Sequence, residues 1–296
     1  MFTILCAVLA GICVTLQNSL NALMNPFIGA MGTSAAVFVI QLVLLLAYQA
    51  CVVRRRIRLR DVPPGYYSSG LIAVVVIGMI GYCVSQMGSA VTTCCSVAGQ
   101  IIMSALVDHF GLFGSARHRF TARRVAGFAL ILAGVLVLNL AGGASAGRTP
   151  LQLLLLAVLL GCGAVVVRTL NFKATQATGS TIGGGIVNSL SGAFFGLLLY
   201  FIVHGFRPDL SAFTAFSPAY YTAGLFGGAC LLLNIAAYAR QNVFYATIFM
   251  LIGQVATGIA MDLLVFHALS AGKCLGMAII LTGVLLDKLL TRARSA

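Results

Sequence analysis

Residues 251–262 read LIGQVATGIAMD, and residues 97–108 read VAGQIIMSALVD. Each stretch places a Gly-Gln pair inside an apolar run and an aspartate eight residues after the glutamine. A buried amide without a hydrogen-bonding partner costs several kcal/mol in hydrocarbon, so neither glutamine can face lipid. The two stretches therefore indicate a duplicated membrane segment whose polar side chains point inward.

The composition is that of an integral membrane protein. The chain has 296 residues, of which 60% are hydrophobic and 8% are charged, whereas soluble domains carry about a quarter charged residues. Because about 20 apolar residues cross a bilayer as a helix, the runs predict an all-α membrane protein. The first run is expected to be retained as a span. The ten predicted spans are 2–24, 33–53, 66–86, 90–108, 123–141, 151–170, 182–204, 218–239, 243–265 and 272–290.

The basic residues predict the orientation of these spans. With the N-terminus inside, fifteen of the 18 lie in cytoplasmic segments: Arg54, Arg55, Arg56, Arg58, Arg60, Arg117, Arg119, Arg123, Arg124, Arg168, Lys173, Arg240, Lys288, Arg292 and Arg294. The other three, Arg148, Arg207 and Lys273, lie in outer segments. Cytoplasmic loops are rich in Lys and Arg, so both termini are predicted inside. This distribution explains the net charge of +13 without a nucleic-acid partner.

The chain contains an internal repeat. Tyr66-Tyr67 aligns with Tyr220-Tyr221, and the same register reaches Asp108 and Asp262 without a gap. Near the start of each copy, Gly11 pairs with Gly161 and Asn21 with Asn171. Each copy has five spans, an odd number, so the copies are predicted to be inverted relative to one another, as in many secondary transporters. The predicted organisation is a first five-helix repeat at 1–141, an outer linker at 142–150 and a second repeat at 151–296.

These motifs resemble a known family. Gly99-Gln100, the sequence DHFG at 108–111, Arg124, Gly127 and Gly134 are similar to the YdcZ-like family, a five-span branch of the drug/metabolite transporter superfamily that includes fused ten-span members. Gly11, Gln17, Asn21 and Ala22 fit the pattern of its first span. The second half departs from it, because Asp262 is followed by Leu-Leu-Val and Val167 replaces Gln17. The resemblance implies transport of a small solute.

Gln100 and Gln254 are the first candidates for a binding site. Both are predicted near the middle of the membrane, on polar stripes with spacings of three and four residues. One interpretation is a midplane site built from both repeats. The other is a structural role, since intramembrane amides often bond neighbouring helices and the adjacent Gly99 and Gly253 permit close helix approach.

Further polar residues are candidates for contact with the solute. They are Gln17, Asn18 and Asn21 in the first span, Arg168 and Asn171 in the sixth, Asn188 in the seventh and Asn234 in the eighth. Arg168 can attract a carboxylate or phosphate, or it can extend to the cytoplasmic headgroups.

Two aspartates near the membrane edges are candidate gates. Each precedes a basic residue at the start of the next span: Arg123 or Arg124 follows Asp108, and Lys273 follows Asp262. One ion pair on each face would suit alternating access. The alternative is that each aspartate makes a permanent ion pair or caps a helix.

The lack of a predicted acidic residue at mid-membrane limits the expected class of solute. All five acidic residues are aspartates, and none is predicted at mid-membrane. The expected function is therefore secondary transport of a neutral, zwitterionic or weakly anionic small organic solute across the inner membrane, with a lipid or lipid-linked headgroup flippase as the alternative. No catalytic, cofactor or metal site is predicted, since the nine cysteines lack ligand spacing. Membrane lipids are the other expected partners; a monomer suffices, and a homodimer is compatible.

Overall fold

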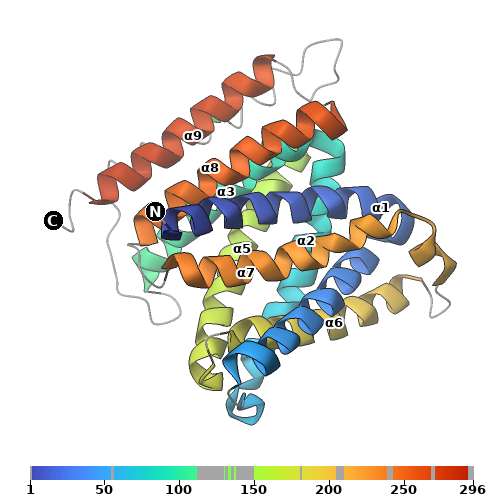
Figure 1. The fold of residues 1–296 in the computed structure, drawn as a ribbon. Coiled ribbons are helices and arrows are strands. Elements are labelled where there is room, and N and C mark those ends of the chain that lie inside the picture. The colour runs from blue at the N-terminus through green and yellow to red at the C-terminus, as the bar shows by residue number, and fades with distance from the viewer. Residues whose placement is uncertain are drawn as a thin grey trace. The chain divides into compact units, whose positions relative to one another are not determined.

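The computed structural model describes residues 2–54, 57–111, 130, 133–134, 137, 150–180, 182–204, 210–238, 243–267 and 271–292. All regular secondary structure in these ranges is helical (Figure 1). The long helices are α1 (Phe2–Tyr48), α2 (Ser68–Met87), α3 (Ser89–Phe110), α5 (Leu151–Thr178), α6 (Gly183–Val203), α7 (Thr222–Tyr238), α8 (Val243–Met261) and α9 (Ala271–Arg292). Short 3-10 or π turns extend several of them: η1 (Gln49–Val53), η2 (Leu59–Asp61), η3 (Pro64–Tyr67), η5 (Leu210–Thr214), η6 (Pro218–Tyr221) and η7 (Asp262–Phe266).

α1 corrects one prediction. The sequence predicts a loop at 25–32 between the first two spans, but helical structure continues through this region and bends at Gly29. Gly29 has φ 68° and ψ 169°, a conformation that a residue with a Cβ adopts only with strain. Pro26, which lacks an amide proton, lies one turn before the bend and weakens the helix there. α1 therefore consists of two arms that fold back at Gly29 (Figure 1).

The other described helices match predicted spans closely, although α5 extends eight residues beyond its predicted end at 170. Six described segments are long and apolar enough to cross a membrane: Phe2–Val53, Pro64–Met87, Ser89–Val107, Leu151–Thr178, Gly183–Val203 and Phe249–Phe266. The first contains both arms of α1. Most of the predicted fifth span, at 123–141, and the linker before Pro150 lie outside the described residues. The architecture is that of an all-helical membrane protein.

The helices form two compact units. The first unit comprises Met1–Ser85 and Val166–Gln254, and the second comprises Gln86–Val165 and Val255–Ala296. Each unit thus contains segments from both predicted repeats. The unit boundaries fall inside α5 and α8 and in the last turn of α2.

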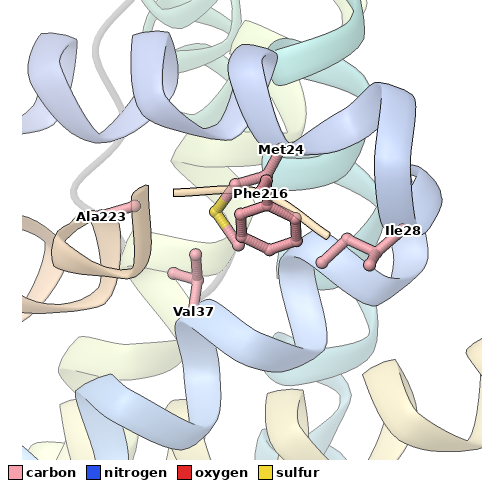
Figure 2. Packing of buried hydrophobic residues seen from close by; sticks show 5 residues of the cluster. All are labelled: Met24, Ile28, Val37, Phe216 and Ala223. Carbon is pink, nitrogen blue, oxygen red and sulfur yellow. The ribbon is translucent and has the colours of Figure 1, made fainter. Parts of the chain in front are cut away.

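In the first unit, α1 packs along α6 and α7. Phe216 lies between η5 and η6. It is buried in one apolar cluster by α7 and by the two arms of α1 (Figure 2). The cluster comprises Met24, Ile28, Val37, Phe216 and Ala223. Because Met24 and Ile28 precede the bend and Val37 follows it, burial of these side chains holds the two arms together.

In the second unit, α3 packs against α9. Gly134 also lies against α9, because a Cβ on this residue would approach the Ile280 nitrogen to 2.9 Å. The C-terminal part of α8 meets the first turn of α3, because a Cβ on Gly258 would lie 3.0 Å from the Cα of Ala90. Contacts this close require glycine.

Candidate functional site

Three amides line one face of the first arm of α1. Gln17, Asn21 and Asn25 follow one another at intervals of four residues, which places them on the same side of a helix. Gln17 is 5% exposed, and its carboxamide lies against α7, where a Cβ on Gly227 would come within 2.9 Å of the Gln17 Oε1. Together these residues form an amide ladder within the first unit.

The far end of the amide ladder lies against α2. The Asn25 Nδ2 donates a hydrogen bond of 3.2 Å to the backbone oxygen of Gly78. One turn along α2, a Cβ on Gly81 would lie 3.0 Å from the Asn25 Nδ2 and 3.1 Å from the Asn21 Cβ. Glycines on α2 and α7 therefore let both helices come close to the amides.

Asn21 is the least satisfied residue of the ladder. Its side chain is 0% exposed, and neither its Oδ1 nor its Nδ2 has a hydrogen-bond partner. Leaving a buried polar group unpaired costs about 1–3 kcal/mol. Unpaired buried carboxamides are uncommon in folded proteins, so Asn21 stands out among the candidate residues of the ladder.

A second polar group lies on α7, close to the ladder. The Asn234 Nδ2 donates to the Cys230 Sγ at 3.3 Å, and the Arg168 guanidinium of α5 lies within electrostatic range of the same side chain. Cys230 is one turn from Gly227, the residue against which Gln17 packs. The structure therefore brings three predicted site residues, Gln17, Arg168 and Asn234, into one region of the first unit.

Gln254 lies on α8, beside the same arm of α1. It is 5% exposed, and its backbone oxygen accepts a 3.2 Å hydrogen bond from the Thr15 hydroxyl. Gln100 belongs to the second unit, where it is half-buried and its Nε2 donates to the Ser96 Oγ at 3.4 Å. Both glutamines are thus held against helices, and they lie in different units.

The glycine next to Gln254 makes a close helix contact. A Cβ on Gly253 would collide with the backbone oxygen of Val8, and a Cβ on Gly11 would collide with the backbone oxygen of Met250. The two glycines thus face each other's helix, and α1 and α8 approach to backbone contact. This geometry is the small-residue packing that membrane helices use.

The glycine next to Gln100 makes the same contact in the second unit. A Cβ on Gly99 would collide with the backbone oxygen of Val158, and a Cβ on Gly161 would collide with the backbone oxygen of Ser96. Every residue here is the repeat counterpart of one in the α1–α8 contact: α3 corresponds to α8 at an offset of 154 residues, and α5 corresponds to α1 at 150. The contact is therefore made twice, each time between helices of opposite halves.

A second contact is also duplicated, wholly within the first unit. On α2, a Cβ on Gly70 would collide with Ser191 and Gly192 of α6. On α7, a Cβ on Gly224 would lie 3.0 Å from the Val37 oxygen, on the second arm of α1. Gly224 and Ser191 follow Gly70 and Val37 at the same offset of 154 residues. Contacts between helices of opposite halves thus recur with the repeat.

Asp262 is a buried acidic residue of the second unit. It is 1% exposed, and its carboxylate accepts hydrogen bonds from the backbone nitrogens of Ser89 and Ala90, the latter at 2.9 Å. These are the first two residues of α3, whose amides have no partner within the helix. Asp262 therefore caps α3 across a sequence separation of more than 170 residues. Capping was one of the two interpretations that the sequence left open.

The other members of the predicted gates are less completely described. Asp108 lies in the last turn of α3 and Lys273 in the first turn of α9, but their side chains lie outside the described part of the structure. Arg123 and Arg124 also lie outside it. The gate hypothesis for these pairs stays a prediction.

Removing the Asp262 carboxylate is expected to destabilise the protein. In Asp262→Ala, two amides at the start of α3 lose their acceptor inside the bundle, which should lower the free energy of unfolding by about 2 kcal/mol. Asp262→Asn, which keeps one oxygen acceptor, should lose less. Thermal unfolding of the purified protein measures both, with the exposed Asp61→Ala as the control. An unchanged melting temperature for Asp262→Ala would show that the cap contributes nothing.

The remaining predicted residues are spread over the first unit. Asn18 is half-buried on α1. Asn171 is half-buried on α5, where α6 reaches its backbone at Gly184 and its Oδ1 has no partner. Asn188 is buried on α6, and its Oδ1 is also unpaired. The structure does not place these three beside the ladder.

Sequence reasoning missed Asn25 and Cys230. Asn25 continues the spacing of Gln17 and Asn21, but the first span was predicted to end before it. Cys230 gave no signal, because isolated cysteines in apolar runs are usually packing residues. None of the nine cysteines forms a disulfide. Within the described residues, no three His, Cys, Asp or Glu side chains are grouped so that they could hold a metal ion.

Comparison with known proteins supplies a family. A family model described as "Putative inner membrane exporter, YdcZ" matches residues 2–137 and 152–286. A protein of known crystal structure, 17% identical, matches 97% of this chain and 98% of its own with a TM-score of 0.56, which shows a shared fold alone. No curated protein matches the chain.

Proposed function

The chain belongs to the YdcZ family of inner membrane exporters, and we propose that it moves a small organic solute across the membrane by alternating access. It is a multi-pass transporter of the inner membrane, and its family is one of transporters rather than enzymes. The finer proposal concerns the mechanism and the solute. Alternating access requires a binding site that opens first to one side of the membrane and then to the other.

The observation that carries the mechanism is the duplicated glycine contact. α1 meets α8 at Gly11 and Gly253, and α5 meets α3 at Gly161 and Gly99. In inverted-repeat transporters, the inward- and outward-facing states arise when the two repeats exchange conformations. The first half contributes α1 to one contact and α3 to the other, and the second half contributes the counterparts α8 and α5. This equivalence supports such an exchange, because each half can adopt the role of the other without a new kind of contact.

We place ten spans in the membrane as two inverted five-helix repeats, with both termini in the cytoplasm. Fusions of alkaline phosphatase, which is active only outside, are expected to be active after Ala141 and inactive after Ala296. Fluorescent-protein fusions should show the reverse, and a fusion after Arg60 is the internal cytoplasmic control. If the fusions after Ala141 and Ala296 report the same side, the inverted repeat is wrong and the transport mechanism falls with it.

The proposed solute is neutral, zwitterionic or weakly anionic. In the described part of the first unit, the candidate groups close to the amide ladder are the amides of Gln17, Asn21 and Asn234 and the guanidinium of Arg168. Asp262, the buried acid of the described part, binds the α3 amides instead. A site of amides with one cation suits such a solute better than an organic cation, which would need a carboxylate.

Solute exchange in proteoliposomes tests the function. A thermal-shift screen of metabolites on the purified protein selects solutes, and exchange of the labelled solute across vesicles that contain the protein is then measured. Vesicles without protein are the control. If no solute that stabilises the protein exchanges faster than in empty vesicles, the protein is not a transporter of these solutes.

A further inference from the structure

Asn21 differs from the other members of the amide ladder in what surrounds it. Its side chain is fully buried against α2, and both of its polar atoms are unpaired. In Asn25 only the Oδ1 is unpaired, because its Nδ2 donates to Gly78, and Gln17 packs against Gly227. Asn21 thus stands in the middle of the ladder with its donors and its acceptor unused.

An unused carboxamide at this place lowers the stability of the protein. An apolar side chain of the same shape, such as leucine, would remove the cost of the unpaired atoms and improve packing. Proteins keep such destabilising groups at functional sites, where activity and stability compete. Asn21 differs from Thr33 and the other buried unpaired groups because both of its polar atoms are unpaired and because it lies between Gln17 and Asn25 on the face of α1 that carries the candidate amides. This combination indicates that a ligand supplies the missing partners of Asn21.

From this geometry we propose that Asn21 binds the transported solute through a paired donor and acceptor on the solute, as found in a primary carboxamide, a lactam or a ureide. The Oδ1 of asparagine accepts and its Nδ2 donates, so the carboxamide matches an edge that offers one N–H beside one C=O. Gln17 and Asn25 lie one turn away on either side and hold α7 and α2 against the ladder. This inference rests on the proposed transport function and names the chemical class of its solute.

Solutes that lack an N–H beside a C=O are not expected to bind at Asn21. A buried site built to hydrogen-bond its ligand strongly rejects analogues that cannot do so, because its polar atoms would then stay unpaired. Replacement of the amide by a methyl ester, or methylation of its N–H, removes the donor and adds one methyl group for each donor group that is lost. Matched amide and ester solutes therefore test the edge directly.

The experiment combines stability and transport in Asn21→Leu. The variant is expected to melt about 2–4 °C higher than the wild type, since an unpaired buried amide is removed, and to lose more than tenfold of its solute exchange. The probes are three matched pairs: nicotinamide with methyl nicotinate, uracil with 1,3-dimethyluracil, and glutamine with glutamate γ-methyl ester. The first member of at least one pair should stabilise and exchange through the wild type, and its partner should not.

Thr33→Val is the matched control. The Thr33 hydroxyl is also fully buried and unpaired, on the second arm of α1. The variant should therefore gain stability as well, but its exchange should equal that of the wild type. Asn21→Ala is the second variant, which removes the amide without filling the space.

The outcomes separate this proposal from the broader one. If Asn21→Leu and Asn21→Ala both melt well below the wild type, the amide is bonded within the protein and the proposal is wrong. It is also wrong if either variant exchanges normally, or if the wild type binds none of the amide probes. When another solute still exchanges in the wild type, transport stands and only the solute class falls. When nothing exchanges at all, the transport function itself has failed.

Discussion

Gly99→Val is expected to reduce the free energy of unfolding by about 3 kcal/mol, at the upper end of overpacking effects. A Cβ at this position would collide with the backbone oxygen of Val158. A backbone carbonyl cannot rotate away as a side chain can, so α3 and α5 must separate. Gly253→Val should cost a similar amount, because the same collision occurs with Val8 of α1. Thermal unfolding and the yield of folded protein measure both variants.

Gly65→Val is the control for these substitutions. Gly65 lies in η3 and is exposed, and a Cβ at this position would meet no atom within 4 Å. Its variant should unfold like the wild type. Equal melting temperatures for Gly99→Val and the wild type would mean that α3 and α5 are not in backbone contact. The duplicated contact would then no longer support alternating access.

Gln100→Ala and Gln254→Ala are each expected to reduce solute exchange more than tenfold while the protein is still produced and inserted. A tenfold loss corresponds to about 1.4 kcal/mol, which is within the contribution of one hydrogen bond in a dry site. The structure buries Gln254 beside α1 and gives the Gln100 carboxamide a long bond to Ser96. Exchange in proteoliposomes is compared at equal amounts of reconstituted protein.

Gln152→Ala provides the comparison, since this glutamine is exposed at the start of α5 and should leave exchange unchanged. Normal exchange in both Gln100→Ala and Gln254→Ala would assign these amides to helix packing. A loss of exchange that accompanies a large fall in melting temperature would support packing as well. The prediction therefore requires that transport falls while stability holds.

The sequence predicted the helices and the repeat because both depend on local chemistry. Apolar runs of about 20 residues allow few structures in a membrane. Gly99 and Gly253 were predicted to permit close helix approach, and the structure places both at helix contacts, together with the repeat-matched Gly11 and Gly161. What the spacing did not predict was the partner of each glycine, because a partner lies far away in the sequence.

The same limit applies to the candidate site. The cap that Asp262 provides for α3 depends on a contact between opposite halves, which no local pattern reveals. The bend at Gly29 depends on one residue with positive φ. Because a loop was predicted there, Asn25 was not recognised as a member of the amide ladder. Gln17, Arg168 and Asn234 were each predicted as candidates, but only the fold shows that α7 brings them together.

The mixed origin of the two compact units has a consequence for biosynthesis. When the ribosome has completed the first 141 residues, α1 has none of its partners α6, α7 and α8, and the Gln17 carboxamide lacks the helix that covers it. Insertion of individual helices and their final assembly must therefore be separate events, as in two-stage assembly of membrane proteins. We therefore expect that the polar side chains of α1 make temporary contacts in the bilayer until α6, α7 and α8 have been synthesised.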